Sequence, residues 1–343
     1  MSRGRRIAKV AGAGVGVGAG LAVTGFAALA GVLWGEGKLA KRRIPIAHEP
    51  PPASDNMIWA AAGVSSTRPP IRIALAGDST AAGYGTHRER DTPAARMALG
   101  ISDVARRPVH VTNVAVVGAE SKDLEPQIDA LLGHPPELAV IMIGANDVTE
   151  STRPDVAVPY LETAVRRLRA VGTEVIVGTC PDLGVIQPIA QPLRTWARRQ
   201  SRHMAAAQTI AVVRAGGTTV SLGDLLGPEF AGRLDLFAAD RFHPSAAGYR
   251  LAILAMLPSA LDALGLRTRA RSASAFTTRR AKPVAKAAAQ AAARPGSEVS
   301  PTADRPVTAV RAAGTWARLR RRRPKGRIHD TSESATQVTP ATT

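Results

Sequence analysis

The sequence has a single cysteine, Cys180, and few aromatic side chains, which make up 3% of its 343 residues. One thiol excludes an intrachain disulfide and a cysteine-rich metal site. Cys180 follows the mainly apolar run 175–179, and a cysteine in such a position packs as a small apolar residue more often than it reacts. We therefore expect one ordinary hydrophobic core, for which a hydrophobic content of 45% suffices.

Motifs for metals and nucleotides are also missing. Asp, Glu and His do not cluster at the spacing of metal ligands, and the glycine-rich segment that begins at Gly77 lacks both the P-loop lysine and the dinucleotide pattern. Four histidines have no partner at catalytic spacing, and we expect them to be surface or structural residues: His87, His110, His134 and His203. The sequence predicts no metal and no cofactor.

The formal charge of +18 lies almost entirely at the two ends of the chain. Residues 1–43 carry 8 basic and 1 acidic side chains, for a net charge of +7, and residues 267–343 carry 17 and 4, for a net charge of +13. The middle, 44–266, has 20 basic and 22 acidic side chains, for a net charge of −2. A nucleic-acid-binding domain would place its positive charge on a folded face, so nucleic acid is not the expected partner.

The basic N-terminal region, 1–43, contains an uncharged stretch from Val10 to Trp34. Its 25 residues are long enough to cross a bilayer, which takes about 20. A secretory signal with a cleavage site near Ala30 is the alternative. Because the apolar run continues past Ala30 and then meets further basic residues, we favour a retained membrane anchor at residues 10–34, with the catalytic domain outside the cytoplasm or in the cell envelope.

The composition of two further segments predicts little regular structure. Residues 44–70 are rich in Pro and Ala and predict a linker, and residues 267–343 are basic, have little apolar periodicity and predict a disordered C-terminal tail. The run 318–327 in that tail has the composition of a short basic helix that binds anionic lipid headgroups, although a solvated tail is the simpler interpretation.

Strand and helix patterns alternate between these ends. Short apolar runs predict five strands, at 71–76, 109–117, 138–143, 174–179 and 218–222. Helical stretches separate or follow them, at 93–104, 123–132, 158–171, 192–214 and 245–264. Such alternation predicts an α/β domain over residues 71–266, with three layers and a five-stranded parallel sheet. Reactive groups in such sheets lie at the carboxyl ends of the strands.

Polar residues and glycines follow three of these strands. Ser79 stands at the turn after the first strand, where its N–H would lie at a helix N-terminus and favour an oxyanion. Gly118 follows the second strand and Asn146 the third, and each is placed to offer an N–H to a developing alkoxide. Asp78 and Asp147 flank these positions, and we expect them to hold loops by side-chain to backbone hydrogen bonds.

The motif Asp240-Arg241-Phe242-His243-Pro244 lies just before the last predicted helix. A carboxylate three residues before a histidine can accept a hydrogen bond from one imidazole nitrogen and leave the other to take a serine proton. Each of these motifs alone could have a purely structural role, such as a turn or a helix cap. Together they supply a nucleophile, a base, an orienting acid and three oxyanion donors.

This set resembles the GDSL/SGNH hydrolase family in order and spacing over residues 71–264. Ser79, Gly118, Asn146 and His243 match its four signature residues, and Asp240 matches the acid of its Asp-x-x-His pair. Thr80 and Ala145 depart from the commonest family residues, but neither supplies a reacting atom. The resemblance implies a flavodoxin-like fold, catalysis by Ser79, Asp240 and His243, an oxyanion hole of Ser79, Gly118 and Asn146, and no metal.

We therefore expect a serine esterase that hydrolyses small-molecule or lipid esters through an acyl-Ser79 intermediate. Few aromatic residues and no long apolar lid segment favour short or medium acyl chains. An acyltransferase or a deacetylase of an envelope glycan or lipid would use the same triad, and the sequence does not separate these activities. A non-catalytic envelope binding protein is a further alternative, against which the complete catalytic set argues.

Overall fold

A computed structural model describes residues 50–186, 189–223, 233–266, 282–294, 296–301, 316–321 and 337–338. Within these residues one sheet of ten strands forms the centre of the molecule, in the order β10-β1-β3-β2-β4-β5-β6-β8-β9-β7. The five central strands are β2 (Ile71–Gly77), β3 (Val109–Asn113), β4 (Leu138–Met142), β5 (Glu174–Gly178) and β6 (Thr218–Val220).

The five central strands are parallel to one another, which confirms the predicted α/β class and the five-stranded parallel sheet. In order of sequence they lie 2-1-3-4-5, the flavodoxin-like order. The chain reverses direction across the sheet at β2, so the loops after β3 and β4 lie on either side of the end of β2. A crevice at such a switch point is where doubly wound folds place their ligands.

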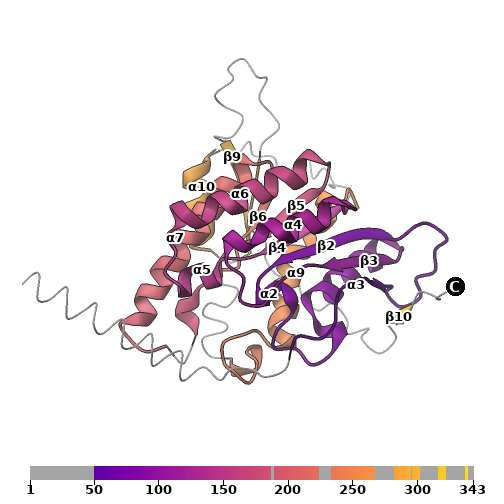
Figure 1. Cartoon of the computed structure of the whole chain (residues 1–343), viewed down its shortest axis with the longest axis horizontal. Coiled ribbons are helices and arrows are strands. Elements are labelled where there is room, and N and C mark those ends of the chain that lie inside the picture. The colour runs from indigo at the N-terminus through magenta and orange to yellow at the C-terminus, as the bar shows by residue number, and fades with distance from the viewer. Residues whose placement is uncertain are drawn as a thin grey trace, which may run out of the picture.

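Helices cover both faces of this sheet (Figure 1). One face, with Ile73 and Leu75 at its centre, packs against α3 and α9. The other face, with Ala74 and Ala76, packs against α4, α6 and α7. These helices agree closely with the predicted stretches: α3 (Pro93–Ala105), α4 (Leu124–Leu132), α6 (Pro154–Ala170), α7 (Leu193–Arg214) and α9 (Ala246–Ala263).

Short elements occupy the loops between them. Two helices of one turn follow strands β2 and β4 and carry predicted site residues: α2 (Ser79–Ala82) and α5 (Ala145–Thr149). Four 3-10 turns complete the central part: η1 (Glu89–Asp91), η2 (Ser121–Asp123), η3 (Leu183–Val185) and η4 (Leu234–Leu236).

The domain extends beyond the predicted limits of 71–266 at both ends, which corrects two predictions. The predicted linker 44–70 contains β1 (Met57–Trp59), which pairs antiparallel with β3 and buries Trp59. The predicted disordered tail 267–343 supplies a helix and four strands to the domain: β7 (Lys282–Pro283), α10 (Val284–Ala292), β8 (Ser297–Pro301), β9 (Trp316–Arg321) and β10 (Gln337–Val338).

The C-terminal additions are part of the core. Strand β8 pairs antiparallel with β6, and β9 pairs with β8. Val284, Ala287 and Val299 are fully or almost fully buried in one cluster with Val213 of α7. Sequence reasoning missed these elements because α10 consists largely of alanine, and because each strand is short and has a polar composition. Residues 318–321, for which a solvated tail was the simpler interpretation and a basic helix the alternative, lie in β9.

None of the helices in the described residues is long and apolar enough to span a bilayer. The predicted anchor, residues 10–34, lies outside the described residues, as do the rest of 1–43 and residues 322–327 of the basic run.

Candidate active site

Ser79 stands at a sharp turn where β2 ends and α2 begins. Gly77 has a φ of +130°, and a Cβ there would lie 1.8 Å from the carbonyl oxygen of Met142, so only glycine fits this turn. Asp78 then caps α2, and its Oδ1 accepts a hydrogen bond from the N–H of Thr80 at 2.8 Å. Ser79 is the first residue of the helix, with 7% of its surface exposed. The turn fixes the hydroxyl at the carboxyl edge of the sheet.

His243 lies on the loop before α9 and contacts both of its predicted partners. Its Nε2 is 3.1 Å from Ser79 Oγ, and its Nδ1 is 2.6 Å from Asp240 Oδ2. The other carboxylate oxygen, Asp240 Oδ1, accepts the N–H groups of Phe242 and His243, each at 2.9 Å. The structure thus brings together Ser79, His243 and Asp240 from the two ends of the domain, 164 residues apart along the chain.

The charge of Asp240 is stabilised in place. Burial raises the pKa of this carboxyl, but the hydrogen bonds from the His243 ring and from two backbone N–H groups outweigh burial and hold the pKa below its ordinary value of 3.8. Asp240 is therefore ionised at neutral pH. An ionised Asp240 is an acceptor only, so Nδ1 of His243 carries the proton and Nε2 is free to accept one from Ser79.

Packing around His243 fixes the plane of its ring. Tyr84 and Phe242 approach the imidazole edge-on, with ring centroids 4.5 Å and 4.9 Å away. Tyr249, which is fully buried, donates its hydroxyl to the carbonyl oxygen of Tyr84 at 2.7 Å. Gly85 has a φ of +90°, and a Cβ there would clash with the loop around His243 and Pro244. The contacts of these aromatic residues with the base were not predicted from the sequence, because no spacing motif links Tyr84 or Tyr249 to His243.

The predicted oxyanion donors lie on loops that flank Ser79. Gly118 follows β3 at an exposed turn with a φ of +85°; its left-handed backbone, rather than crowding, explains the glycine. The N–H of Val116 in this loop donates to the carbonyl oxygen of Gly77 at 3.0 Å, which ties the loop to the turn before Ser79. Asn146 lies in the first turn of α5, and its Nδ2 donates to the carbonyl oxygen of Ala119 at 2.9 Å. An amide nitrogen carries two hydrogens, so one remains for a substrate oxygen.

Two buried acids flank these positions. Burial raises the pKa of Asp78 from 3.8 to about 6, although the hydrogen bonds from Thr80 partly oppose it. Burial also raises the pKa of Asp147, against the opposing hydrogen bonds from Ser121. Both side chains accept backbone N–H groups, as predicted for loop-holding residues. Burial raises the pKa of the Cys180 thiol well above its ordinary value, which keeps it protonated, as expected of a packing residue.

Two buried glutamines hold the strand ends and were not predicted. Gln127 of α4 accepts the N–H of Gly77 at 2.7 Å and donates to its carbonyl oxygen at 3.1 Å. Gln208 of α7 accepts the N–H of Cys180 at 2.7 Å and donates to the carbonyl oxygen of Ile143 at 2.9 Å. Each satisfies backbone groups where the sheet ends, one before Ser79 and one before Asn146. A glutamine on the apolar face of each predicted helix was the available signal.

The arrangement has the geometry of nucleophilic acyl transfer. A hydroxyl, an imidazole and a carboxylate form one hydrogen-bonded series, and the Val116 N–H holds the Gly118 loop against the strand that leads to Ser79. Among the described residues no group of three or more His, Cys, Asp or Glu side chains is arranged to hold a metal ion.

The chain is similar in sequence to a known protein family and to a curated esterase, and in fold to several solved structures. The GDSL-like lipase/acylhydrolase family matches residues 75–251. A GDSL-like esterase of Mycobacterium tuberculosis is 41% identical over 254 residues, which cover 71% of this chain and 81% of that protein. An acetyl-xylooligosaccharide esterase from Geobacillus stearothermophilus is a similar solved structure, with a TM-score of 0.46, 18% identity and coverage of 60% of this chain and 99% of that one. The structure of TesA has a TM-score of 0.45, 21% identity and coverage of 57% and 99%.

Proposed function

Because the chain belongs to the GDSL-like lipase/acylhydrolase family and is an esterase of the GDSL/SGNH type, we propose that it hydrolyses carboxylic esters through an acyl-enzyme on Ser79. The observation that carries this proposal is the hydrogen-bonded series from Ser79 Oγ to His243 Nε2 at 3.1 Å and from His243 Nδ1 to Asp240 Oδ2 at 2.6 Å. Nucleophile, base and orienting acid are already within hydrogen-bond reach of one another.

In the first half of the reaction, Ser79 Oγ attacks the ester carbonyl carbon while His243 Nε2 takes the hydroxyl proton. The carbonyl oxygen becomes an oxyanion, which the N–H groups of Ser79 and Gly118 and the Asn146 amide stabilise. The tetrahedral intermediate then expels the alcohol, which leaves with the proton from His243. Ionised Asp240 stabilises the imidazolium while it lasts.

In the second half, a water molecule loses a proton to His243 and attacks the acyl carbon. Collapse of the second tetrahedral intermediate releases the carboxylic acid and returns the proton to Ser79. Every proton passes through one nitrogen, Nε2, because Nδ1 stays bonded to Asp240. The two half-reactions therefore need no further acid or base.

The substrate class that we propose is an ester with a short or medium acyl chain. Val116 and Val117, in the loop that carries Gly118, are the exposed apolar side chains next to this donor, with 53% and 46% of their surface exposed. Valine side chains offer a small apolar contact, which suits a short acyl group better than a sugar hydroxyl. A series of p-nitrophenyl esters from acetate to palmitate measures the preference, and a maximum of kcat/KM at palmitate would contradict it.

The location that we propose is the membrane or cell envelope, through residues 10–34. The support is the sequence: 25 uncharged residues with basic residues on both sides. Full-length protein should stay with the membrane fraction after a carbonate wash, whereas a chain that begins at residue 44 should not. Recovery of both proteins in the soluble fraction would overturn the assignment.

Two substitutions test the chemistry. Ser79→Ala and His243→Ala should each lower ester turnover to near background and leave the unfolding transition intact, because the nucleophile and its base act as a unit. A fluorophosphonate probe should label the wild type on Ser79 and leave Ser79→Ala unlabelled. Ser65→Ala, at an exposed serine, is the matched control and should keep full activity. Wild-type turnover in Ser79→Ala would refute the mechanism.

A further inference from the structure

The two loops that carry Gly118 and Asn146 lie on either side of the end of β2, and side chains connect them directly. Gly118 follows β3 and Asn146 follows β4, and β2 lies between these strands. The Val116 N–H ties the Gly118 loop to the end of β2, but the hydrogen bonds that run directly from this loop to the Asn146 loop involve side chains. An oxyanion hole built from both loops depends on the gap between them, because its donors must converge on a single oxygen.

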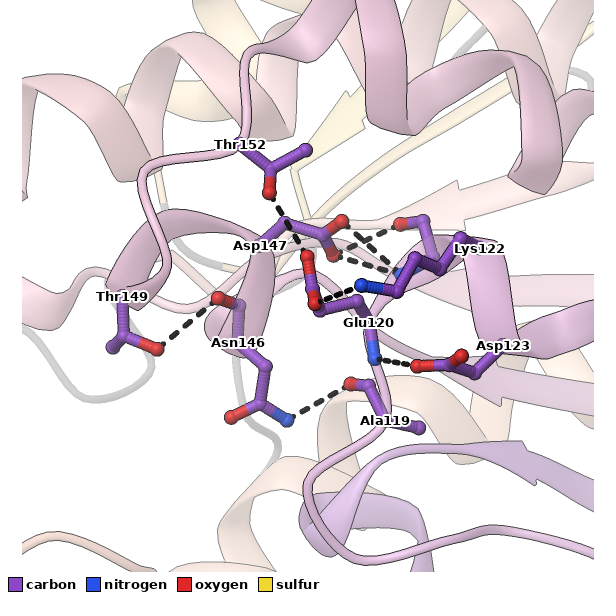
Figure 2. A network of polar contacts seen from close by, with 9 residues as sticks. Ala119, Glu120, Lys122, Asp123, Asn146, Asp147, Thr149 and Thr152 are labelled. Carbon is purple, nitrogen blue, oxygen red and sulfur yellow. Dashed lines mark hydrogen bonds and ion pairs between the residues drawn. The ribbon is translucent and has the colours of Figure 1, made fainter.

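Asp147 crosses this gap. Both of its carboxylate oxygens lie 3.1 Å from the backbone nitrogen of Ser121, and Oδ2 also accepts the Ser121 hydroxyl at 2.9 Å. Asp147 and Ser121 each expose only 1% of their surface. In Figure 2 the Asp147 carboxylate points from α5 into the loop that holds Ala119 and Glu120. The contact is a buried bridge of hydrogen bonds between the two loops.

The neighbouring residue makes a parallel contact. Asn146 Nδ2 donates to the carbonyl oxygen of Ala119 at 2.9 Å, next to Gly118 (Figure 2). At the rim, Thr152 Oγ1 donates to Glu120 Oε2 at 2.9 Å. Asn146 contributes one hydrogen bond between the two loops. The Asp147 bridge, two residues further along the Gly118 loop, adds a second and more deeply buried point of attachment.

A buried carboxylate is a costly way to hold a loop, since burial disfavours its charge. Burial raises the pKa of Asp147, and the hydrogen bonds from Ser121 only partly oppose it. The advantage of the carboxylate is that it accepts both the N–H and the hydroxyl of Ser121. These two hydrogen bonds hold Ser121 from two directions.

We propose that Asp147 is a positioning residue of the oxyanion hole, which holds the Gly118 N–H and the Asn146 amide at the separation that the tetrahedral intermediate requires. This inference rests on the proposed function and adds to it a residue that touches no reacting atom. Displacement of a catalytic donor by about 1 Å can cost on the order of 10²-fold in rate. The loss falls on kcat, because the oxyanion exists in the transition state and not in the bound ester.

The test uses the full chain and p-nitrophenyl acetate. Asp147→Ala should lower kcat by about 10- to 100-fold per active site while KM changes by less than about twofold. Active sites are counted by complete labelling with the fluorophosphonate probe, so that misfolded protein does not enter kcat. Asp147→Asn, which keeps an acceptor for the Ser121 N–H, should restore most of the loss. Lys122→Met, which breaks an exposed ion pair with Glu120 inside one loop, is the control and should match the wild type.

Coupling to Asn146 separates positioning from a general structural role. In an Asn146→Ala background, one of the two donors that Asp147 is proposed to position is already absent. Asp147→Ala should therefore lower kcat much less in this background than it does in the wild type. Should Asp147→Ala fail to fold, Ser121→Ala carries the test: it removes one bond of the bridge and should lower kcat severalfold, with the same loss of effect in the Asn146→Ala background.

Three outcomes would overturn the inference. They are a wild-type kcat per labelled site in Asp147→Ala, or in Ser121→Ala if the former does not fold; a loss confined to KM; and a full additive loss in the Asn146→Ala background. Failure of the proposed function looks different, since the wild type itself would then neither hydrolyse the ester nor be labelled at Ser79.

Discussion

Asp240 and His243 are joined twice. The carboxylate accepts the backbone N–H of His243 through Oδ1 at 2.9 Å and contacts the ring nitrogen Nδ1 through Oδ2 at 2.6 Å. The first bond shapes the tight loop, and the second orients the ring toward Ser79. A spacing of three residues allows both, because the loop turns back on the carboxylate between them. One side chain therefore sets both the backbone and the tautomer of the base.

The Asp240→Asn substitution should separate these two tasks. An amide can still accept the backbone N–H groups through its oxygen, but it carries no charge and can present an N–H to Nδ1, which favours the wrong tautomer. We expect kcat/KM to fall by at least about tenfold.

The measurement is kcat/KM of the wild type and Asp240→Asn with one ester that does not ionise. The control is the unfolding midpoint of both proteins under the assay conditions. An unchanged rate in the variant would reduce the triad to a Ser79–His243 dyad.

Asn146→Ala should lower kcat by about 10²- to 10³-fold with a small change in KM, because an oxyanion donor binds the transition state more tightly than the ester. Steady-state kinetics on purified, labelled protein measures this. Thr149→Ala is the matched control on the same short helix: its hydroxyl donates to the Asn146 carbonyl oxygen at 3.1 Å, and its loss should leave kcat close to that of the wild type. A change in KM alone would move Asn146 to substrate binding.

Asp78 should destabilise the native state at neutral pH. Its folded pKa, about 6, lies above the ordinary 3.8, so the folded protein binds the proton more tightly than the unfolded chain does. The contribution of Asp78 to stability is therefore fully present below pH 3.8 and is lost as the pH rises from 3.8 to about 6. Asp78→Asn keeps a cap for Thr80 without the charge, and it should unfold with a free energy higher by about 3 kcal/mol at pH 7.5 and close to that of the wild type near pH 4.

Urea unfolding at both pH values measures this difference. Asp103→Asn, at an aspartate with 68% of its side chain exposed, is the control and should show no comparable pH dependence. An Asp78→Asn variant that is less stable than the wild type at pH 7.5 would show that the charge of Asp78 is needed.

A chain that ends at residue 266 should be much less stable than the full chain. The truncation removes the partner of strand β6 and the apolar cover of Val213, which Val284, Ala287 and Val299 provide. The midpoint of thermal unfolding should be clearly lower for the chain that ends at residue 266 than for the full chain. The truncated protein should also expose apolar surface that the full chain buries. A chain that ends at residue 321 keeps α10, β8 and β9 and is the matched control, with a midpoint near that of the full chain. Equal midpoints for all three chains would show that the C-terminal elements contribute nothing.

Local sequence patterns were enough to predict the central sheet. Apart from Arg72 and Glu174 near their starts, the strands at 71–76, 138–143 and 174–179 are buried on both faces, so their sequences are mainly apolar. Ser79 and Asn146 could be placed for the same reason: once the strands are parallel, their carboxyl ends share an edge, and the residues that follow them are brought together. The Asp240–His243 contact is local to one loop, so the spacing alone was sufficient.

Only the tertiary structure decided what short or polar segments do. Residues 57–59 and 297–301 become strands because β3 and β6 offer them open edges, and nothing in their own composition requires it. The alanine-rich helix 284–292 is buried because α7 presents Val213 to it. Asp147 could be predicted to hold a loop, but its partner, Ser121, lies 26 residues away across β2. Contacts between residues so far apart in the sequence depend on the completed fold, because the order of the strands places both loops beside the end of β2.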